Sequence, residues 1–252
     1  MMKKINISEG RGYSIPCAYN INGDEKIVCI IVHGFGSNKD SATARMMVEE
    51  LPIRGIGAIS FDLPAHGESA VDGEYLRIEN CMSDLGAVEA IARTLAPNAE
   101  IVFFASSFGA YITLIYLAEM GTSNRRAFLR AAAVSMPTVI RQRITPEQKQ
   151  CLDTAGELIL NKHGYGYSRD LKITRGFMDD MERYDVFRLW QEGLARLHMV
   201  HGEADQTILL CDAQRFAEMF HVPLTIVSNG DHQLSAAGTP KYVLELASGF
   251  FM

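Results

Sequence analysis

Short apolar runs rich in β-branched residues alternate along the chain with longer segments that have helical spacing. The run 27–32 (IVCIIV) is apolar throughout, which is typical of a parallel strand covered on both faces. An N-terminal hairpin is expected over 5–21. Further strands are expected at 56–61, 101–105, 131–136, 197–200 and 224–227, and helices at 41–51, 76–95, 108–120, 211–220 and 242–251. This alternation predicts an α/β fold with a doubly wound, mainly parallel sheet.

The alternation stops between residues 137 and 192, where no convincing strand is found. A break of this length predicts an insertion that folds as helices or a lid. We therefore expect a core domain made of 1–136 and 193–252, with a helical cap over 137–192. Apolar side chains that could line a pocket beneath the cap, or form the cap's own small core, are Met136, Tyr165, Tyr167, Phe177, Met178, Met181 and Trp190.

Composition narrows the class of protein. Hydrophobic residues make up 48% of the 252 residues and the net charge is −6, so nothing favours nucleic acid or an anionic membrane surface as a partner. The one dense basic stretch, Arg125, Arg126 and Arg130, is expected to cap or follow a helix. No apolar run reaches the roughly 18 residues of a membrane span. The five cysteines are scattered without metal-ligand spacing, which favours reduced thiols and a cytoplasmic protein.

The candidate nucleophile is Ser107, in the segment ASSFG at 105–109. This segment follows a predicted buried strand and opens a predicted buried helix, which is the context of a G-x-S-x-G nucleophile elbow. The positions two before and two after the serine must be small, and they hold Ala105 and Gly109. A serine that merely caps an ordinary helix is the alternative.

A serine nucleophile needs a base and an orienting acid, which should follow it in the order acid, then histidine. HGEAD at 201–205 and SNGDH at 228–232 each follow a predicted strand. Loops at the carboxyl ends of parallel strands meet at one edge of the sheet, so Asp205 and His232 can converge on Ser107. Glu203 remains open as a rival acid. Ser106 and Asp231 are weaker rivals, and His33, His66 and His201 are expected to be structural.

At this point the chain resembles the α/β-hydrolase superfamily, in particular its esterase, lysophospholipase and feruloyl-esterase-like members. HGFG at 33–36, DLPAHGES at 62–69, HGEAD at 201–205 and GDH at 230–232 match its loops in the right order, with Ala65 in place of a glycine. The resemblance implies Ser107 as nucleophile, His232 as general base and acid, and Asp205 as the group that orients His232. It also implies an oxyanion hole made by the backbone N–H groups of Phe35 and Phe108.

We therefore expect a serine hydrolase that cleaves a small carboxylic ester through an acyl-enzyme, without cofactor or metal. A serine peptidase, thioesterase or C–C hydrolase with the same triad stays open. An aminopeptidase would need acidic residues near the pocket, and the cap offers Asp179, Asp180, Glu182 and Asp185. The third hypothesis is a protein of another class, which binds a ligand on this fold and turns it over slowly.

Overall fold

The computed structural model describes residues 2–8, 12–121, 124–165 and 167–252, without the side chains at 164 and 165. Its described residues form an eight-stranded sheet in the order β1-β2-β4-β3-β5-β6-β9-β10. Strands β1 and β2 form the antiparallel N-terminal hairpin, β2 also pairs antiparallel with β4, and the remaining neighbours are parallel. This confirms the predicted fold. The strands are Lys3–Ser8, Ser14–Asn20, Ile27–Val32, Ile56–Phe61, Glu100–Ser106, Arg125–Arg130, Ala195–Gly202 and Leu224–Val227.

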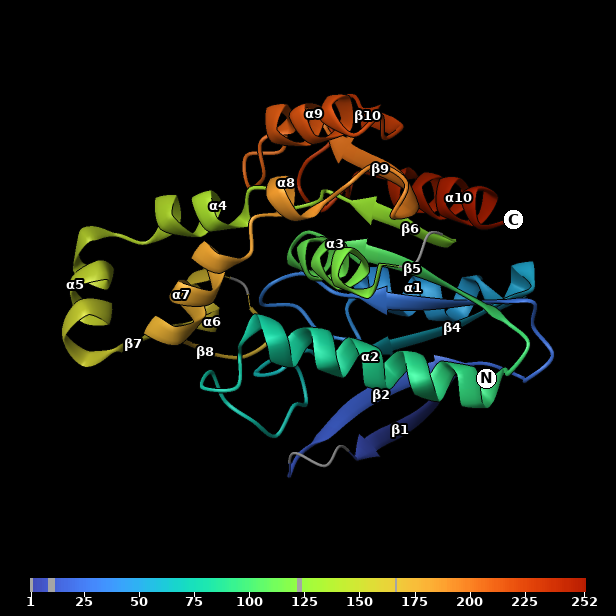
Figure 1. The fold of residues 1–252 in the computed structure, drawn as a ribbon, viewed down its shortest axis with the longest axis horizontal. Helices are drawn as coiled ribbons and strands as arrows, with labels where there is room; N and C mark the ends of the chain where they lie inside the picture. Colours follow the sequence, from blue (N-terminus) through green and yellow to red (C-terminus); the bar gives the residue numbers. More distant parts are fainter. Residues whose placement is uncertain (1, 9–11, 122–123, 166) are drawn as a thin grey trace.

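Helices cover both faces of the sheet because alternate strand residues are apolar on both sides. Phe103 of β5 packs into the core on the side of α2, α3 and α9, whereas Phe104 packs against α1 and α10 on the opposite side. Figure 1 shows the sheet between these two layers. The bounds are α1 Ala42–Glu50, α2 Ile78–Leu95, α3 Phe108–Met120, α9 Leu210–Met219 and α10 Thr239–Phe251, with a short 3-10 helix at Pro52–Arg54.

The predicted strand at 131–136 is wrong, since β6 spans Arg125–Arg130 and the chain then turns into a helix at Met136. The expectation that Arg125, Arg126 and Arg130 cap or follow a helix is also wrong, because all three lie in strand β6. Arg125 pairs with Glu89 at 2.5 Å and Arg126 with Glu100 at 2.8 Å. These ion pairs at the amino end of the strand let β6 carry basic residues within a mostly buried sheet.

We refer to residues 137–192, between β6 and β9, as the cap segment. It lies at the carboxyl edge of the parallel strands, on the left in Figure 1. The expectation that it holds no strand is wrong, because β7 and β8 pair antiparallel as a separate two-stranded sheet. Its elements, of which the first begins one residue earlier, are α4 Met136–Arg143, α5 Pro146–Ala155, β7 Glu157–Leu160, α6 Lys162–Tyr165, β8 Leu171–Thr174, α7 Arg175–Arg183 and α8 Val186–Leu189.

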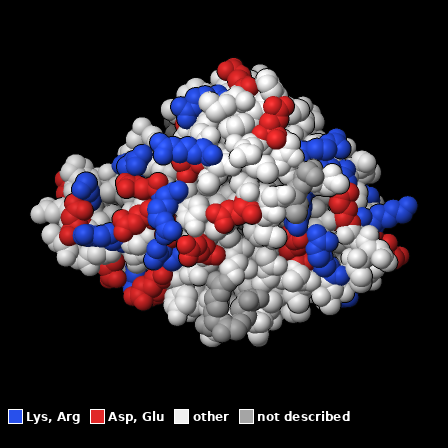
Figure 2. Space-filling model, in the orientation of Figure 1, with Lys and Arg blue, Asp and Glu red and all other residues white. Residues whose placement is uncertain are grey.

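Charged side chains of both signs are interspersed over the face seen in Figure 2, and many of them gather over the cap segment. Several form ion pairs there; Lys172 of β8, for example, lies 3.2 Å from Asp72 and 3.4 Å from Glu157. Among the described residues, no helix combines the length and the apolar character that crossing a bilayer requires.

Candidate active site

Ser107 occupies a tight turn between β5 and α3 at the carboxyl edge of the sheet. Its φ of 51° and ψ of −115° lie where a residue with a side chain is strained. Gly109 permits the turn, since a Cβ atom there would lie 2.4 Å from the carbonyl oxygens of Val32 and His33. The Ser107 side chain makes no capping hydrogen bond to α3. The simple helix-cap interpretation therefore does not describe this serine.

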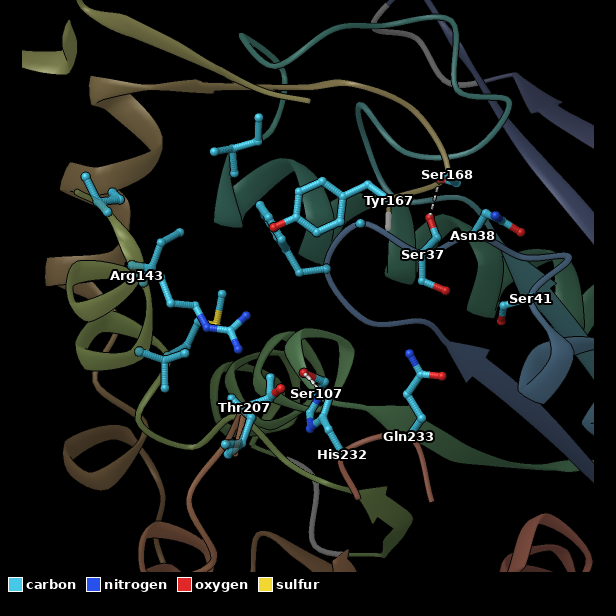
Figure 3. Close-up of a pocket in the computed structure, with 18 of the residues that line it drawn as sticks. Ser37, Asn38, Ser41, Ser107, Arg143, Tyr167, Ser168, Thr207, His232 and Gln233 are labelled. Carbon is cyan, nitrogen blue, oxygen red and sulfur yellow. Dashed lines mark hydrogen bonds between the residues drawn. The ribbon is translucent and has the colours of Figure 1, made fainter. Parts of the chain in front are cut away.

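His232 reaches Ser107 from the loop after β10. Its Nε2 lies 3.1 Å from Ser107 Oγ, and its Nδ1 lies 2.7 Å from Asp205 Oδ2. Asp205 stands in the loop after β9, so all three side chains come from carboxyl ends of parallel strands (Figure 3 shows Ser107 and His232). The structure thus brings together the three residues that the sequence selects as a triad.

Asp205 is held as a buried carboxylate. Its Oδ1 accepts backbone N–H bonds from Thr207 at 2.7 Å and Ile208 at 2.9 Å. His201 Nε2 lies 3.2 Å from Asp205 Oδ2, the same oxygen that His232 Nδ1 contacts. Burial alone would raise the pKa of Asp205, but hydrogen bonds from His201, His232 and the backbone hold this pKa well below its usual value. The carboxylate therefore stays ionised beside the His232 imidazole.

Two backbone N–H groups are placed near Ser107. Phe108 is the first residue of α3, so its N–H has no partner within the helix. The N–H of Phe35 has no hydrogen-bond acceptor among the described residues. The loop that carries Phe35 approaches Ser107 closely, because a Cβ atom on Gly34 would lie 3.3 Å from the Cβ of Ser107. Both groups are thus available to a ligand atom beside Ser107.

The rival residues have other partners. Glu203 accepts a hydrogen bond from the N–H of Asn229 at 3.0 Å, and Asp231 accepts from the backbone and side chain of Ser235. Ser106 lies within β5 and faces Arg130 of β6 in the register. Within the described part of the chain, none of the three contacts the ring of His232.

The remaining histidines of the site region are bound within the core. His33 donates from Nδ1 to the Gly34 carbonyl and accepts the Leu63 N–H on Nε2 at 3.1 Å, which defines a neutral ring. His66 donates to the Pro64 carbonyl, and its ring centroid lies 5.3 Å from that of His33. Burial lowers the pKa of His33 to about 4 and that of His66 to about 3. These two rings therefore remain uncharged and structural.

Two pockets meet at Ser107 and His232. The larger, of about 790 Å³, lies beneath the cap segment, and the smaller, of about 550 Å³, lies beside the start of α1. The larger is lined partly by apolar residues, namely Phe35, Met136, Val139, Ile140, Ile144, Leu160 and Ile208. Because Ser107 stands where the pockets join, a ligand could place one portion in each. Among the described residues, no three His, Cys, Asp or Glu side chains are grouped to hold a metal ion.

The cap side chains proposed from the sequence divide between pocket and core. Met136 and Tyr167 line the larger pocket. Phe177, Met181 and Trp190 are buried in the hydrophobic core and Met178 packs against it. The side chain of Tyr165 lies outside the described part of the chain. Most of this set therefore packs the cap segment against the main core; Phe177, for example, lies against the rings of Phe35 and Phe108.

Tyr167 also fixes the cap segment to the loop after β3. A Cβ atom on Gly36 would lie 2.0 Å from the Tyr167 ring, so only glycine fits there. The N–H of Ser168 donates to the Gly36 carbonyl at 2.8 Å, and its hydroxyl donates to the Ser37 carbonyl at 3.1 Å (Figure 3). The cap segment is thus hydrogen bonded to the loop that carries Phe35.

Two arginines of the site were missed in the sequence. Arg130 is buried at the end of β6, lines the smaller pocket and donates to the carbonyl of Gln233, next to His232. Arg143 of α4 lines the larger pocket. Correct placement of β6 would have put Arg130 at the carboxyl edge of the sheet. The helical spacing of 136, 139, 140 and 143 could have placed Arg143 on the pocket face of its helix.

The mainly parallel sheet, with a hydrogen-bonded Ser-His-Asp line at its carboxyl edge, defines the α/β-hydrolase class. Residues 23–239 match the family described as "Serine aminopeptidase, S33". The chain belongs to this family. No curated protein matches it in sequence.

Solved structures of the same fold span nearly the whole chain. A putative hydrolase from Agrobacterium vitis superposes with a TM-score of 0.84 at 21% identity, covering 100% of this chain and 99% of that one. Est1E from Butyrivibrio proteoclasticus, solved with ferulic acid bound, gives 0.79 at 16% identity, covering 98% and 97%. Mouse α/β-hydrolase domain-containing protein 10 gives 0.75 at 16%, also covering 98% and 97%. At these identities the likeness establishes the fold.

Proposed function

We propose that this chain is a serine hydrolase that cleaves a small carboxylic ester with Ser107, His232 and Asp205 as its triad. The observation that carries the proposal is the continuous line of hydrogen bonds, 3.1 Å and 2.7 Å, from Ser107 through His232 to Asp205. The line opens onto two pockets and starts at a strained turn. The esterase named among the similar structures supports an ester as substrate.

The geometry supports acyl transfer in two steps. Ser107 Oγ attacks the ester carbonyl while His232 Nε2 accepts the hydroxyl proton, and Asp205 stabilises the resulting imidazolium. The N–H groups of Phe35 and Phe108 would donate to the negatively charged oxygen of the intermediate. His232 returns the proton to the departing alcohol, which leaves an acyl group on Ser107. Water, deprotonated by His232, then attacks this acyl group and releases the acid, so no cofactor is required.

The family description makes an aminopeptidase the second candidate. A free substrate amine needs a carboxylate nearby, and the described residues that line the two pockets at Ser107 include no Asp or Glu. Of the cap acids, Asp180 is bound to Arg77, Glu182 lies near Arg141, and Asp185 caps α8. The absence of an acidic lining favours the ester over the aminoacyl substrate.

Hydrolysis of p-nitrophenyl esters, compared with aminoacyl p-nitroanilides, tests the substrate class. We expect the esters to be cleaved, and the Ser107→Ala variant to lose at least about 10³-fold in kcat with an unchanged circular dichroism spectrum. Ser106→Ala is the matched control, since that neighbouring serine does not contact His232, and it should keep its activity. Full activity in Ser107→Ala would refute the site. Preferential cleavage of the anilides would favour the aminopeptidase.

A fluorophosphonate probe gives an independent readout of the nucleophile. We expect it to modify Ser107 covalently, with the adduct located by peptide mass spectrometry, and His232→Ala to slow this labelling. No labelling of Ser107 together with no hydrolysis would contradict the proposal and favour a protein that binds its ligand without turning it over.

A further inference from the structure

One side chain breaks the apolar face that α4 turns toward the larger pocket. Met136, Val139 and Ile140 line the pocket, and the helical repeat continues this stripe to Arg143 at its end. Figure 3 shows the Arg143 side chain pointing from α4 into the pocket. A guanidinium therefore stands where the pattern of the helix calls for an apolar residue.

Arg143 differs from every other arginine of the cap segment in its partners. The other five bind a carboxylate or a backbone carbonyl; for example, Arg169 donates to the Ser69 carbonyl at 2.7 Å, and Arg141 lies 3.6 Å from Glu182. Among the described residues, Arg143 has no ion-pair or hydrogen-bond partner. Arg143 is exposed, so its permanently protonated guanidinium is solvated in the free protein and is available to pair with an anionic group of a ligand.

The pocket offers no internal counter-charge. Its described lining holds no Asp or Glu, and Arg143 is the one Lys or Arg within it. The neighbouring polar groups, such as Thr207 and Gln148, are neutral. A guanidinium is planar and binds carboxylates with two parallel N–H bonds. An anionic group on the ligand would therefore meet a complementary charge, while its carbon chain contacts the apolar stripe of α4.

We propose that the substrate is an ester carrying a carboxylate, which Arg143 binds in the pocket beneath the cap segment. This inference rests on the proposed function, since it specifies the substrate of the same site. Arg143 is then a specificity residue. It would favour a charged substrate over a neutral one of similar size, without taking part in the proton transfers at Ser107.

Matched pairs of esters test the proposal. On the acyl side, p-nitrophenyl hydrogen glutarate is compared with p-nitrophenyl valerate, and on the alcohol side p-acetoxybenzoate with its methyl ester. We expect kcat/KM to favour the anionic member of one pair by about tenfold at low salt and by less at high salt. The pair that shows this preference identifies which part of the substrate lies beneath the cap segment.

The Arg143→Gln variant should lose that preference, because its kcat/KM falls more on the anionic ester than on the neutral one, and Arg143→Lys should keep part of it. Arg141→Gln is the matched control, because Arg141 lies on the same helix, faces Glu182 and lines a different pocket. A preference for the neutral ester in both pairs, or an unchanged ratio in Arg143→Gln, would overturn the proposal and leave the ester-cleaving function intact.

A binding measurement keeps the test independent of turnover. Titration calorimetry on Ser107→Ala protein compares monomethyl glutarate with dimethyl glutarate. Tighter binding of the monoester by about tenfold, lost when Arg143→Gln is added, supports the proposal. Equal affinities overturn it. Failure of the proposed function would show instead as absent hydrolysis and absent labelling of Ser107.

Discussion

Ser107, the proposed nucleophile, occupies a backbone conformation that should cost the folded protein stability. Its positive φ is unfavourable for a side chain but not for glycine. Replacing it with glycine should therefore raise the free energy of unfolding relative to Ser107→Ala by about 1 kcal/mol, after the greater chain entropy of glycine is included. Urea denaturation of the two inactive variants checks this. Equal stabilities would show that the turn is unstrained.

The proposed catalytic residues could be selected from the sequence, because each stands in a short motif that follows a predicted strand. For Arg143, helical spacing can indicate the pocket face of its helix, but the role proposed for it depends on the side chains that surround it and could not be predicted. The sequence gives no indication that five other cap arginines find partners and that this one does not. His201 likewise reads as a backbone-bound histidine, yet it also lies 3.2 Å from the carboxylate of Asp205.

At the scale of elements, a buried carboxylate, that of Asp180, is one of several groups that attach the cap segment to the core. Asp180 of α7 accepts two hydrogen bonds from the Arg77 guanidinium, at 2.6 and 2.7 Å, and one from the N–H of Ile78 at 3.2 Å. Asp180 is 1% exposed, so its charge depends on these donors. They lie at the amino end of α2, where a carboxylate is also favoured by the helix dipole.

Asp180→Asn should weaken this attachment, because an amide supplies one acceptor where the carboxylate supplies two. We expect a loss of about 2 kcal/mol in unfolding free energy and a raised KM for the preferred ester. Chemical denaturation and steady-state kinetics measure the two effects. Asp179→Asn is the control, since Asp179 is exposed, and it should change stability by less than about 0.5 kcal/mol. Equal effects of the two substitutions would contradict the assigned attachment.

Elements were predictable where hydrophobic periodicity was long and regular. The helices and the central strands satisfy this condition, but β6 does not. Arginines obscure the apolar pattern of this strand in the sequence. Arg125 and Arg126 fit into the sheet because Glu89 and Glu100, from other elements, form ion pairs with them. The apolar run that follows, AAAVSM at 131–136, has the hydrophobic pattern of a strand although it does not form one. Strands β7 and β8 are four residues each, too short for alternation to be distinguished from a helix.

For the molecule as a whole, the neutral histidine pair makes stability depend on pH. In the folded protein the pKa of His33 is about 4, against 6.5 for an ordinary histidine. Between these values the unfolded chain binds a proton that the folded protein does not, so stability falls as pH decreases from 6.5 toward 4. The difference corresponds to about 3 kcal/mol for His33. His66 acts in the same direction down to about pH 3.

Below pH 4 the low pKa of Asp205 adds to this loss of stability. The folded state favours the ionised form of Asp205, and that contribution disappears as the carboxyl group is protonated.

We expect the unfolding free energy, measured in urea at pH 7, 6 and 5, to decline steadily. His66→Asn should make the unfolding free energy depend less steeply on pH, by an amount that corresponds to the uptake of at most one proton on unfolding. A flat profile in the unsubstituted protein would contradict the assignment of neutral buried rings.

Under the proposed function, the contact between Tyr167 and Gly36 would link admission of the substrate to the chemistry that follows. A ligand too wide for the pocket must push Tyr167 outward, and Ser168, which is bonded to the Gly36 carbonyl, would then pull on the residue next to Phe35. The Phe35 N–H, the proposed donor to the developing oxyanion, would shift with it. An ester with a bulky acid portion would consequently still bind, but it would be turned over more slowly.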